Sequence, residues 1–196
     1  MTDQVITADD EDEEGSGWGA LDDLPGNPIM WVLIISELLV FGAFFLSFGV
    51  SRLLDPDTFA QSQSLLDGVL GGVNTIVLIT SGLLCALATL AVEAGNIKKT
   101  RAFLAGAISL GAVFGFIKMM EYADKFDQGI GIETDTFFTL FFLMTGFHFL
   151  HVVFGMILLA IAIWKCRADI VITVCAFWHM VDLIWVLLYP LVYLAR

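Results

Sequence analysis

The chain has 196 residues, of which 58% are hydrophobic and 15% are charged. Soluble globular domains average about 45–50% apolar and about 25% charged residues, so the composition excludes an ordinary water-soluble domain. The formal net charge of -12 is concentrated in the acidic run 9–14, and because no basic patch occurs elsewhere, the sequence disfavours nucleic acid as a partner.

The N-terminal segment differs from the rest of the chain. Residues 1–24 are acidic and poor in large aliphatic side chains, a composition typical of disorder. Pro25 and Pro28 then precede the first long apolar stretch. We therefore expect a disordered acidic cytoplasmic tail over 1–24 and a transmembrane domain over 25–196.

Five apolar stretches follow, each close to or above the roughly 20 residues that a helix needs to cross a bilayer. They are 29–50, 69–92, 102–121, 137–164 and 170–195. Continuous apolarity of this length excludes buried strands, and a transmembrane β-barrel needs shorter alternating segments. The sequence predicts an all-α fold, an integral membrane bundle of five transmembrane helices. The short connection 165–169 makes the last two spans antiparallel neighbours.

Lysine and arginine are distributed unevenly between the two sets of connections. One side holds Lys98, Lys99, Arg101, Lys165 and Arg167, and the other holds Arg52, Lys125 and Arg196. Cytoplasmic loops carry the excess of these residues in membrane proteins. The pattern predicts a cytoplasmic N-terminus and a C-terminus on the opposite, periplasmic side.

Several polar side chains fall inside the predicted spans, where each charge costs at least about 2.5–3.5 kcal/mol on insertion scales. These candidate site residues are Glu37, Asn74, Lys118, Glu121, His148, His151, His179 and Asp182. Three pairs are spaced three residues apart and share a helix face: Lys118 with Glu121, His148 with His151, and His179 with Asp182. Motifs of P-loop, serine hydrolase or zinc protease type are missing, so no residue is assigned as catalytic.

Two interpretations of these residues remain open. Three intramembrane histidines are compatible with haem or copper ligation. Alternatively, each histidine has a carboxylate at similar depth, which favours hydrogen-bonded structural pairs and no metal site. Glu37, alone in its span, is equally compatible with a proton or cation site and with a carboxylate that a neighbouring helix satisfies.

The rise of an α-helix gives each of these groups an expected depth. Counted from the cytoplasmic ends of their helices, Glu37 and His179 both lie at roughly 12–14 Å. His151 and Asp182 both fall near the midplane, at about 18–20 Å. We therefore predict two contacts, Glu37–His179 and His151–Asp182, of which the first joins the first span to the last.

Each span also carries a distinctive motif. In chain order the motifs are Ser36–Phe41, Asn74–Thr75, Glu121–Tyr122, Thr145–Gly155, and Phe177–Trp185 followed by Tyr193. In this order they resemble the subunit III family of haem-copper oxidases, in its five-helix form. Three segments are most similar to the NorE-type branch associated with nitric oxide reductase: Glu121–Phe126, Trp178–Leu183 and Tyr189–Tyr193.

The resemblance implies an accessory role. Members of this family carry no haem and no copper, so haem and copper or iron are expected in the partner subunits. The implied partners are the catalytic haem-bearing subunit I, subunit II and membrane lipids. The chain would then stabilise subunit I and support proton uptake in a respiratory oxidase or nitric oxide reductase of the bacterial inner membrane. Two alternatives are a free-standing proton or ion transporter and a membrane assembly factor for the same complex.

Overall fold

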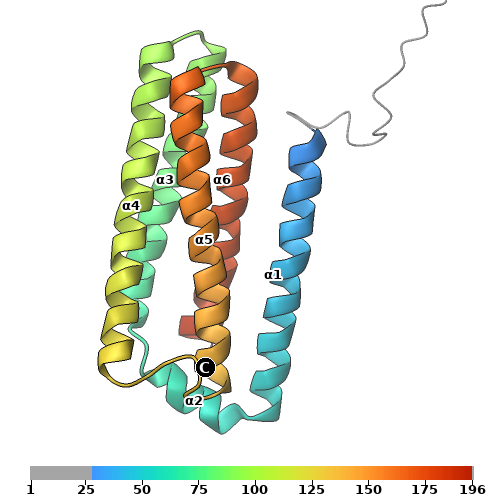
Figure 1. The fold of residues 1–196 in the computed structure, drawn as a ribbon, viewed down its shortest axis with the longest axis vertical. Helices are drawn as coiled ribbons and strands as arrows, with labels where there is room; N and C mark the ends of the chain where they lie inside the picture. Colours follow the sequence, from blue (N-terminus) through green and yellow to red (C-terminus); the bar gives the residue numbers. More distant parts are fainter. Residues whose placement is uncertain (1–27, 196) are drawn as a thin grey trace, which may run out of the picture.

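The structure, a computed structural model, describes residues 28–195 and is helical throughout apart from short connections (Figure 1). The helices are α1 (Pro28–Leu54), α2 (Pro56–Ser64), α3 (Gly68–Glu93), α4 (Ile97–Asp127), α5 (Thr136–Lys165), α6 (Ala168–Tyr189) and a terminal π-helix, η2 (Pro190–Leu194). The predicted acidic tail over 1–24 lies outside the described residues.

Five helices are long and apolar enough to cross a membrane, which confirms the predicted fold class and span count. They cover Ile29–Leu54, Gly68–Glu93, Ile97–Asp127, Thr136–Lys165 and Ala168–Leu194. Several extend beyond the apolar stretch that predicts them, because polar residues at their ends also adopt helix. Asn96 and Asp135, for example, cap the first turns of α4 and α5 by accepting backbone N–H groups, as such residues do at helix N-termini.

The short helix α2 was not predicted, because its nine residues are too few and mostly too polar to carry a transmembrane signal. Asp55 caps its first turn. The ring of Phe59 packs edge-on against Phe137 of α5, with 5.5 Å between centroids. Gln63 donates a 2.9 Å hydrogen bond to the carbonyl of Val192. This helix therefore closes one end of the bundle and fixes the C-terminal segment there.

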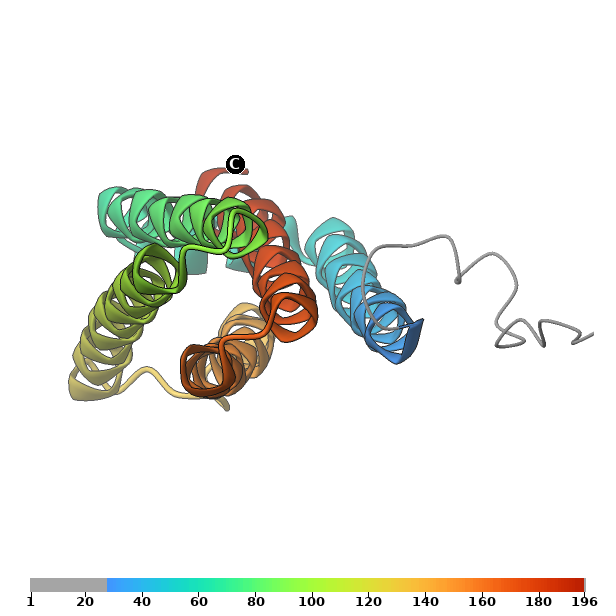
Figure 2. The ribbon, with the colours of Figure 1, turned by 90° about the horizontal axis from the view of Figure 1, so that it is seen from above.

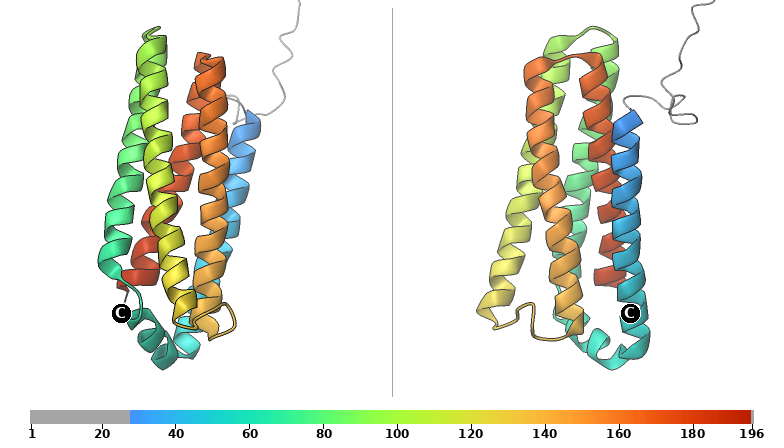
Figure 3. Two further views of the ribbon diagram at one scale, coloured as in Figure 1. Left: turned by 60° about the vertical axis from the view of Figure 1, so that its left-hand side comes forward. Right: turned by 45° about the vertical axis from the view of Figure 1, so that its right-hand side comes forward.

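Helices α3 to α6 form an antiparallel four-helix bundle, and α1 lies on its outside (Figure 1). Seen from above, α6 lies between α3 and α5 and faces α1 (Figure 2), and α1 runs alongside α6 in the right-hand view of Figure 3. Only 11% of the most apolar window of α1 is buried, against 56% for the last span. The last span is thus the centre of the fold and α1 its most peripheral helix.

Trp178 of α6 explains why four helices meet so closely. A Cβ added at Gly111 would lie 2.9 Å from its ring, and one at Gly155 would lie 2.7 Å from it. Its Nε1 donates to Ser81 Oγ at 3.1 Å, and that hydroxyl donates to the carbonyl of Ala107 at 2.9 Å. The indole therefore fills a slot between α4 and α5 and satisfies its polar end on α3, as buried tryptophans usually do.

Candidate functional site

A deeply buried polar cluster joins α4 to the C-terminal π-helix. Lys118 Nζ lies 2.8 Å from Glu121 Oε2 and donates to the Tyr193 hydroxyl at 2.7 Å. The Tyr193 hydroxyl in turn donates to Glu121 Oε1 at 2.7 Å. The spacing of three residues on α4 places the ammonium and the carboxylate on one face, which confirms that part of the sequence prediction.

Lys118 is fully buried, and aromatic rings surround its ammonium group. The nitrogen lies 4.7 Å from the ring centre of Phe141 and 5.2–5.3 Å from those of Tyr122, Trp185 and Tyr193. Ring faces attract cations within about 6 Å, and more strongly where water is excluded. The carboxylate, the phenol and the rings together compensate the loss of hydration.

A second polar contact joins α1 to α5. His151 Nε2 lies 3.1 Å from Glu37 Oε2, an ion-pair distance. His151 Nδ1 lies 2.9 Å from the carbonyl of Phe147 one turn earlier. Because a carbonyl only accepts, Nδ1 carries the proton of that contact. Nε2 faces the carboxyl group at ion-pair distance only, and Glu37 Oε2 has no hydrogen-bond partner among the described residues. Phe41 and Phe147 pack edge-on against the imidazole, so the pair sits among rings.

The predicted contacts Glu37–His179 and His151–Asp182 are wrong, since Glu37 instead meets His151. The depth estimate assumed that all helices begin at one plane. Figure 1 shows that α1 begins well below the connection between α5 and α6, so equal distances along the helices are not equal depths. His179 lies close to Asp182 on its own helix, with 3.8 Å from Nδ1 to Oδ2.

His179 and Asp182 form a third polar group, on the outer face of α6 toward α3. The His179 side chain is 45% exposed and that of Asp182 is 11% exposed. Within the described residues, Asp182 Oδ1 has no hydrogen-bond partner. Asp182 lies directly against Gly82 of α3, where an added Cβ would collide with Oδ2. The missing side chain at Gly82 thus makes the space that the carboxyl group occupies.

His148 and Asn74 lie in the bundle interior. The imidazole of His148 stacks on Trp185, with 5.1 Å between ring centres, and meets Phe114 edge-on. Neither of its nitrogens has a partner among residues 28–195. Asn74 donates to the carbonyl of Phe114 at 3.4 Å, and its own oxygen is unpaired in the described chain. Both residues are core groups shared between α3, α4, α5 and α6.

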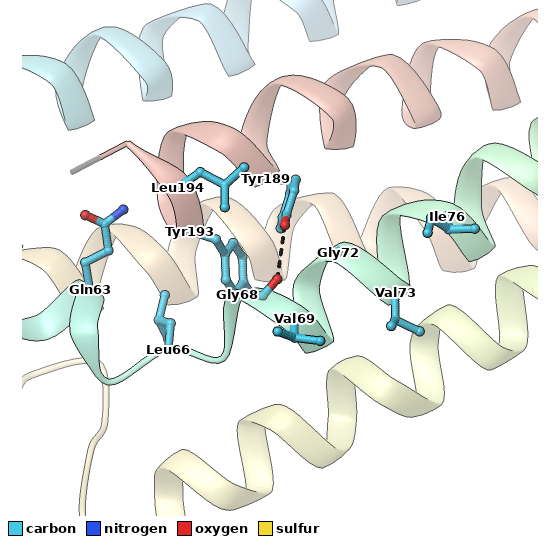
Figure 4. Close-up of a pocket in the computed structure, with 10 residues that line it drawn as sticks. All are labelled: Gln63, Leu66, Gly68, Val69, Gly72, Val73, Ile76, Tyr189, Tyr193 and Leu194. Carbon is cyan, nitrogen blue, oxygen red and sulfur yellow. Dashed lines mark hydrogen bonds between the residues drawn. The ribbon is translucent and has the colours of Figure 1, made fainter.

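A groove of about 650 Å³ opens between the start of α3 and the end of the last span (Figure 4). The hydroxyl of Tyr189 crosses it and donates to the carbonyl of Gly68 at 3.0 Å. Tyr193 and Leu194 line one side, and Val73 lines the other. The mixture of apolar side chains with backbone carbonyl and phenol groups suits the region where hydrocarbon gives way to headgroups.

Several polar contacts were not assigned from the sequence, Tyr193 foremost. Trp185 donates to Thr75 Oγ1 at 3.0 Å, and the hydroxyls of Tyr122 and Thr145 lie 2.7 Å apart. A search for ionisable residues passes over such hydroxyl and indole groups. The available signal was that Tyr and Trp inside a span need a partner for their polar ends.

The candidate polar residues therefore lie in separate places rather than in one site. Lys118 and Glu121 are in the core, Glu37 and His151 lie between α1 and α5, and the His179 group is on the outer face of α6. Within residues 28–195, no three side chains of His, Cys, Asp and Glu gather as a metal-binding group. Chemically, the arrangement joins helices through buried hydrogen bonds and ion pairs.

Comparison with known proteins gives one consistent match. The model of the family described as cytochrome c oxidase subunit III matches residues 27–195. "Cytochrome c oxidase subunit 3" of Thermostichus vulcanus is 29% identical over 178 residues, which cover 83% of this chain and 84% of that protein. "Heme-copper oxidase subunit I+III" of Aeropyrum pernix is 28% identical over 179 residues, 84% of this chain and 22% of that protein. "Cytochrome bo(3) ubiquinol oxidase subunit 3" of Buchnera aphidicola is 24% identical over 174 residues, 84% of each.

Proposed function

Since the chain belongs to the cytochrome c oxidase subunit III family, we propose that it is an accessory, non-redox subunit of a respiratory haem-copper oxidase complex. One observation carries this proposal: the family match runs over residues 27–195 and so includes every described helix. The role is to stabilise the catalytic subunit and to support its proton uptake.

The proposed partners are the haem-bearing subunit I, subunit II and membrane lipids. Haem and copper or iron would reside in those partner subunits. The Aeropyrum pernix relative is named as a subunit I and a subunit III in one protein, which supports contact between the two subunits.

Within this function we assign the chain to the NorE-type branch, on the segments Trp178–Leu183 and Tyr189–Tyr193. The complex that it serves would then reduce either nitric oxide or oxygen. The residues of these motifs support the assignment to this branch. The relatives named above carry cytochrome c oxidase and ubiquinol oxidase names instead.

The proposed location is the bacterial inner membrane, with the N-terminus in the cytoplasm and the C-terminus in the periplasm. The connections around 94–96 and 166–167 lie at the same end of the bundle (Figure 1). They are flanked by Lys98, Lys99 and Lys165. Because positive charge favours the cytoplasmic side, this end is the proposed cytoplasmic face.

A deletion experiment tests the accessory role. Removing the gene should lower the amount of catalytic subunit in the membrane, and restoring the full chain should recover it, because the chain supplies packing and no haem. The haem spectrum of the remaining oxidase should keep its shape. An unchanged oxidase level, together with ion flux through the purified chain in liposomes, would instead establish a free-standing transporter.

A further inference from the structure

One side of the bundle carries two hollows in line along α3 and α6, which together are named the groove along α3 and α6. Its first part is the groove of Figure 4, which reaches Ile76 on α3 and Tyr189 on α6. A second part of about 400 Å³ begins one turn further along, at Ile79 and Val186, and runs to Ala86. From Gly68 to Ala86 the helix rises about 27 Å, nearly the roughly 30 Å thickness of the hydrocarbon core.

The second part of this groove contains an unsatisfied polar group. The side chain of Asp182 is 11% exposed and lines it together with His179. Its Oδ1 has no hydrogen-bond partner within residues 28–195. Its Oδ2 lies against Gly82 and 3.8 Å from His179 Nδ1. A buried carboxyl group without a donor is costly, and in hydrocarbon no water can supply one.

Lipid does not meet this requirement, because acyl chains contain no hydrogen-bond donor. A transmembrane helix does, since Ser, Thr, Asn, Gln, His and Trp side chains donate hydrogen bonds between helices. The rest of the groove suits such a helix, because Leu83 and Val186 flank the polar pair with exposed apolar surface. The needed occupant is therefore an apolar helix that carries one donor near its middle.

We propose that the groove along α3 and α6 receives one transmembrane helix of the haem-bearing catalytic subunit, and that a side chain of this helix donates a hydrogen bond to Asp182. The inference rests on the proposed function, since it takes the partner from it. It adds the face of the chain that binds the catalytic subunit. It also adds the residue that fixes how far the two helices are shifted along each other.

Site-specific photo-cross-linking in the native membrane tests this interface. A benzoylphenylalanine would replace Leu83 or Val186 in the groove, and as controls Phe116 on α4 or Leu150 on α5. The control residues are 67% and 63% exposed, against 58% for Leu83 and 39% for Val186, so the controls are at least as accessible as the groove positions. Both groove positions should cross-link to the catalytic subunit, and both control positions should not.

A second measurement tests the hydrogen bond itself. Asp182→Asn keeps two polar atoms in place, whereas Asp182→Leu removes them. The haem retained per chain after detergent purification should stay near the parent value for the first variant. For the second it should fall about three- to tenfold, the ratio that one interhelical hydrogen bond gives. Should the Leu variant fail to accumulate, the cross-linking at Leu83 and Val186 decides alone.

The outcomes separate the two proposals. Cross-links from the groove to lipid only, or to a second copy of this chain, would overturn the inference while the chain still co-purifies with haem. Cross-links to the catalytic subunit from Phe116 or Leu150 instead of the groove would overturn it as well. If the unmodified chain retains no haem-bearing partner, the proposed function fails and the inference fails with it.

Discussion

Glu37 on α1 and His151 on α5 lie 3.1 Å apart, between Oε2 and Nε2, and they connect the outermost helix to the four-helix bundle. Most of the apolar surface of α1 is exposed in this chain, so packing alone does little to fix the rotation and height of this helix against the bundle. The polar pair fixes both, because rotating or sliding α1 would separate two groups that hydrocarbon cannot satisfy.

A double-mutant cycle should detect this pair. Glu37→Ala and His151→Ala should each lower the thermal stability of the purified chain, and the double variant should lose less than the sum, by about 0.5–3 kcal/mol. Thermal unfolding in detergent measures all four proteins. The matched control combines Glu37→Ala with His179→Ala, two residues that do not contact each other. Their losses of stability should be additive. Coupling in the control instead would contradict the geometry.

The buried ammonium of Lys118 should be the most sensitive position of the fold. Lys118→Met leaves Glu121 buried without its cation, which costs about 3–5 kcal/mol for a broken buried pair. Lys118→Met combined with Glu121→Leu should restore part of the stability, since no charge is then stranded. Unfolding midpoints provide the measurement. Lys99→Met, at an exposed site on the same helix, is the control and should change little.

The slot for Trp178 predicts a steric effect at Gly155. Gly155→Ala places a Cβ 2.7 Å from the indole, and overpacking of this kind typically costs about 1–3 kcal/mol. Gly42→Ala on α1 is the control, because nothing lies within 4 Å of its Cβ position. Both variants gain the same helix propensity, so their difference in unfolding temperature reports the clash. Equal stabilities would contradict the packing.

Topology is testable independently of stability. Reporter fusions at residues 96 and 167 should lie on the same side of the membrane and one at residue 130 on the other, because the first two connections share an end of the bundle (Figure 1). Positive charge near the first two predicts that their side is cytoplasmic. Opposite locations for residues 96 and 167 would be incompatible with five crossings in this order.

The sequence was sufficient for the features that depend on local spacing and length. Apolar length predicted the five spans, and a spacing of three residues predicted that Lys118 and Glu121 share a helix face, where they form an ion pair. Contacts between helices were predicted less well. They depend on how far each helix is shifted along the bundle axis, and no local pattern records that shift. The partner of Glu37 was therefore assigned to His179 rather than His151.

The role of Tyr193 shows a second reason for incomplete prediction. Its hydroxyl completes the contacts of Lys118 because the chain continues past α6 as a π-helix, Pro190–Leu194. In a regular helix the same residue would face a different direction, since the π-helix has a wider turn. Pro190 marks an irregularity in the sequence, but it does not specify which irregular geometry follows.

Co-purification tests the central claim most directly. The full chain, carrying an affinity tag, would be expressed in its native cells and isolated in mild detergent, and the eluate analysed by haem spectroscopy and mass spectrometry. The account predicts a haem-bearing catalytic subunit in stoichiometric amount, with the spectrum disappearing when that partner is stripped away and this chain alone remains. Isolation of this chain by itself under the mildest conditions, with no haem protein attached, would contradict it.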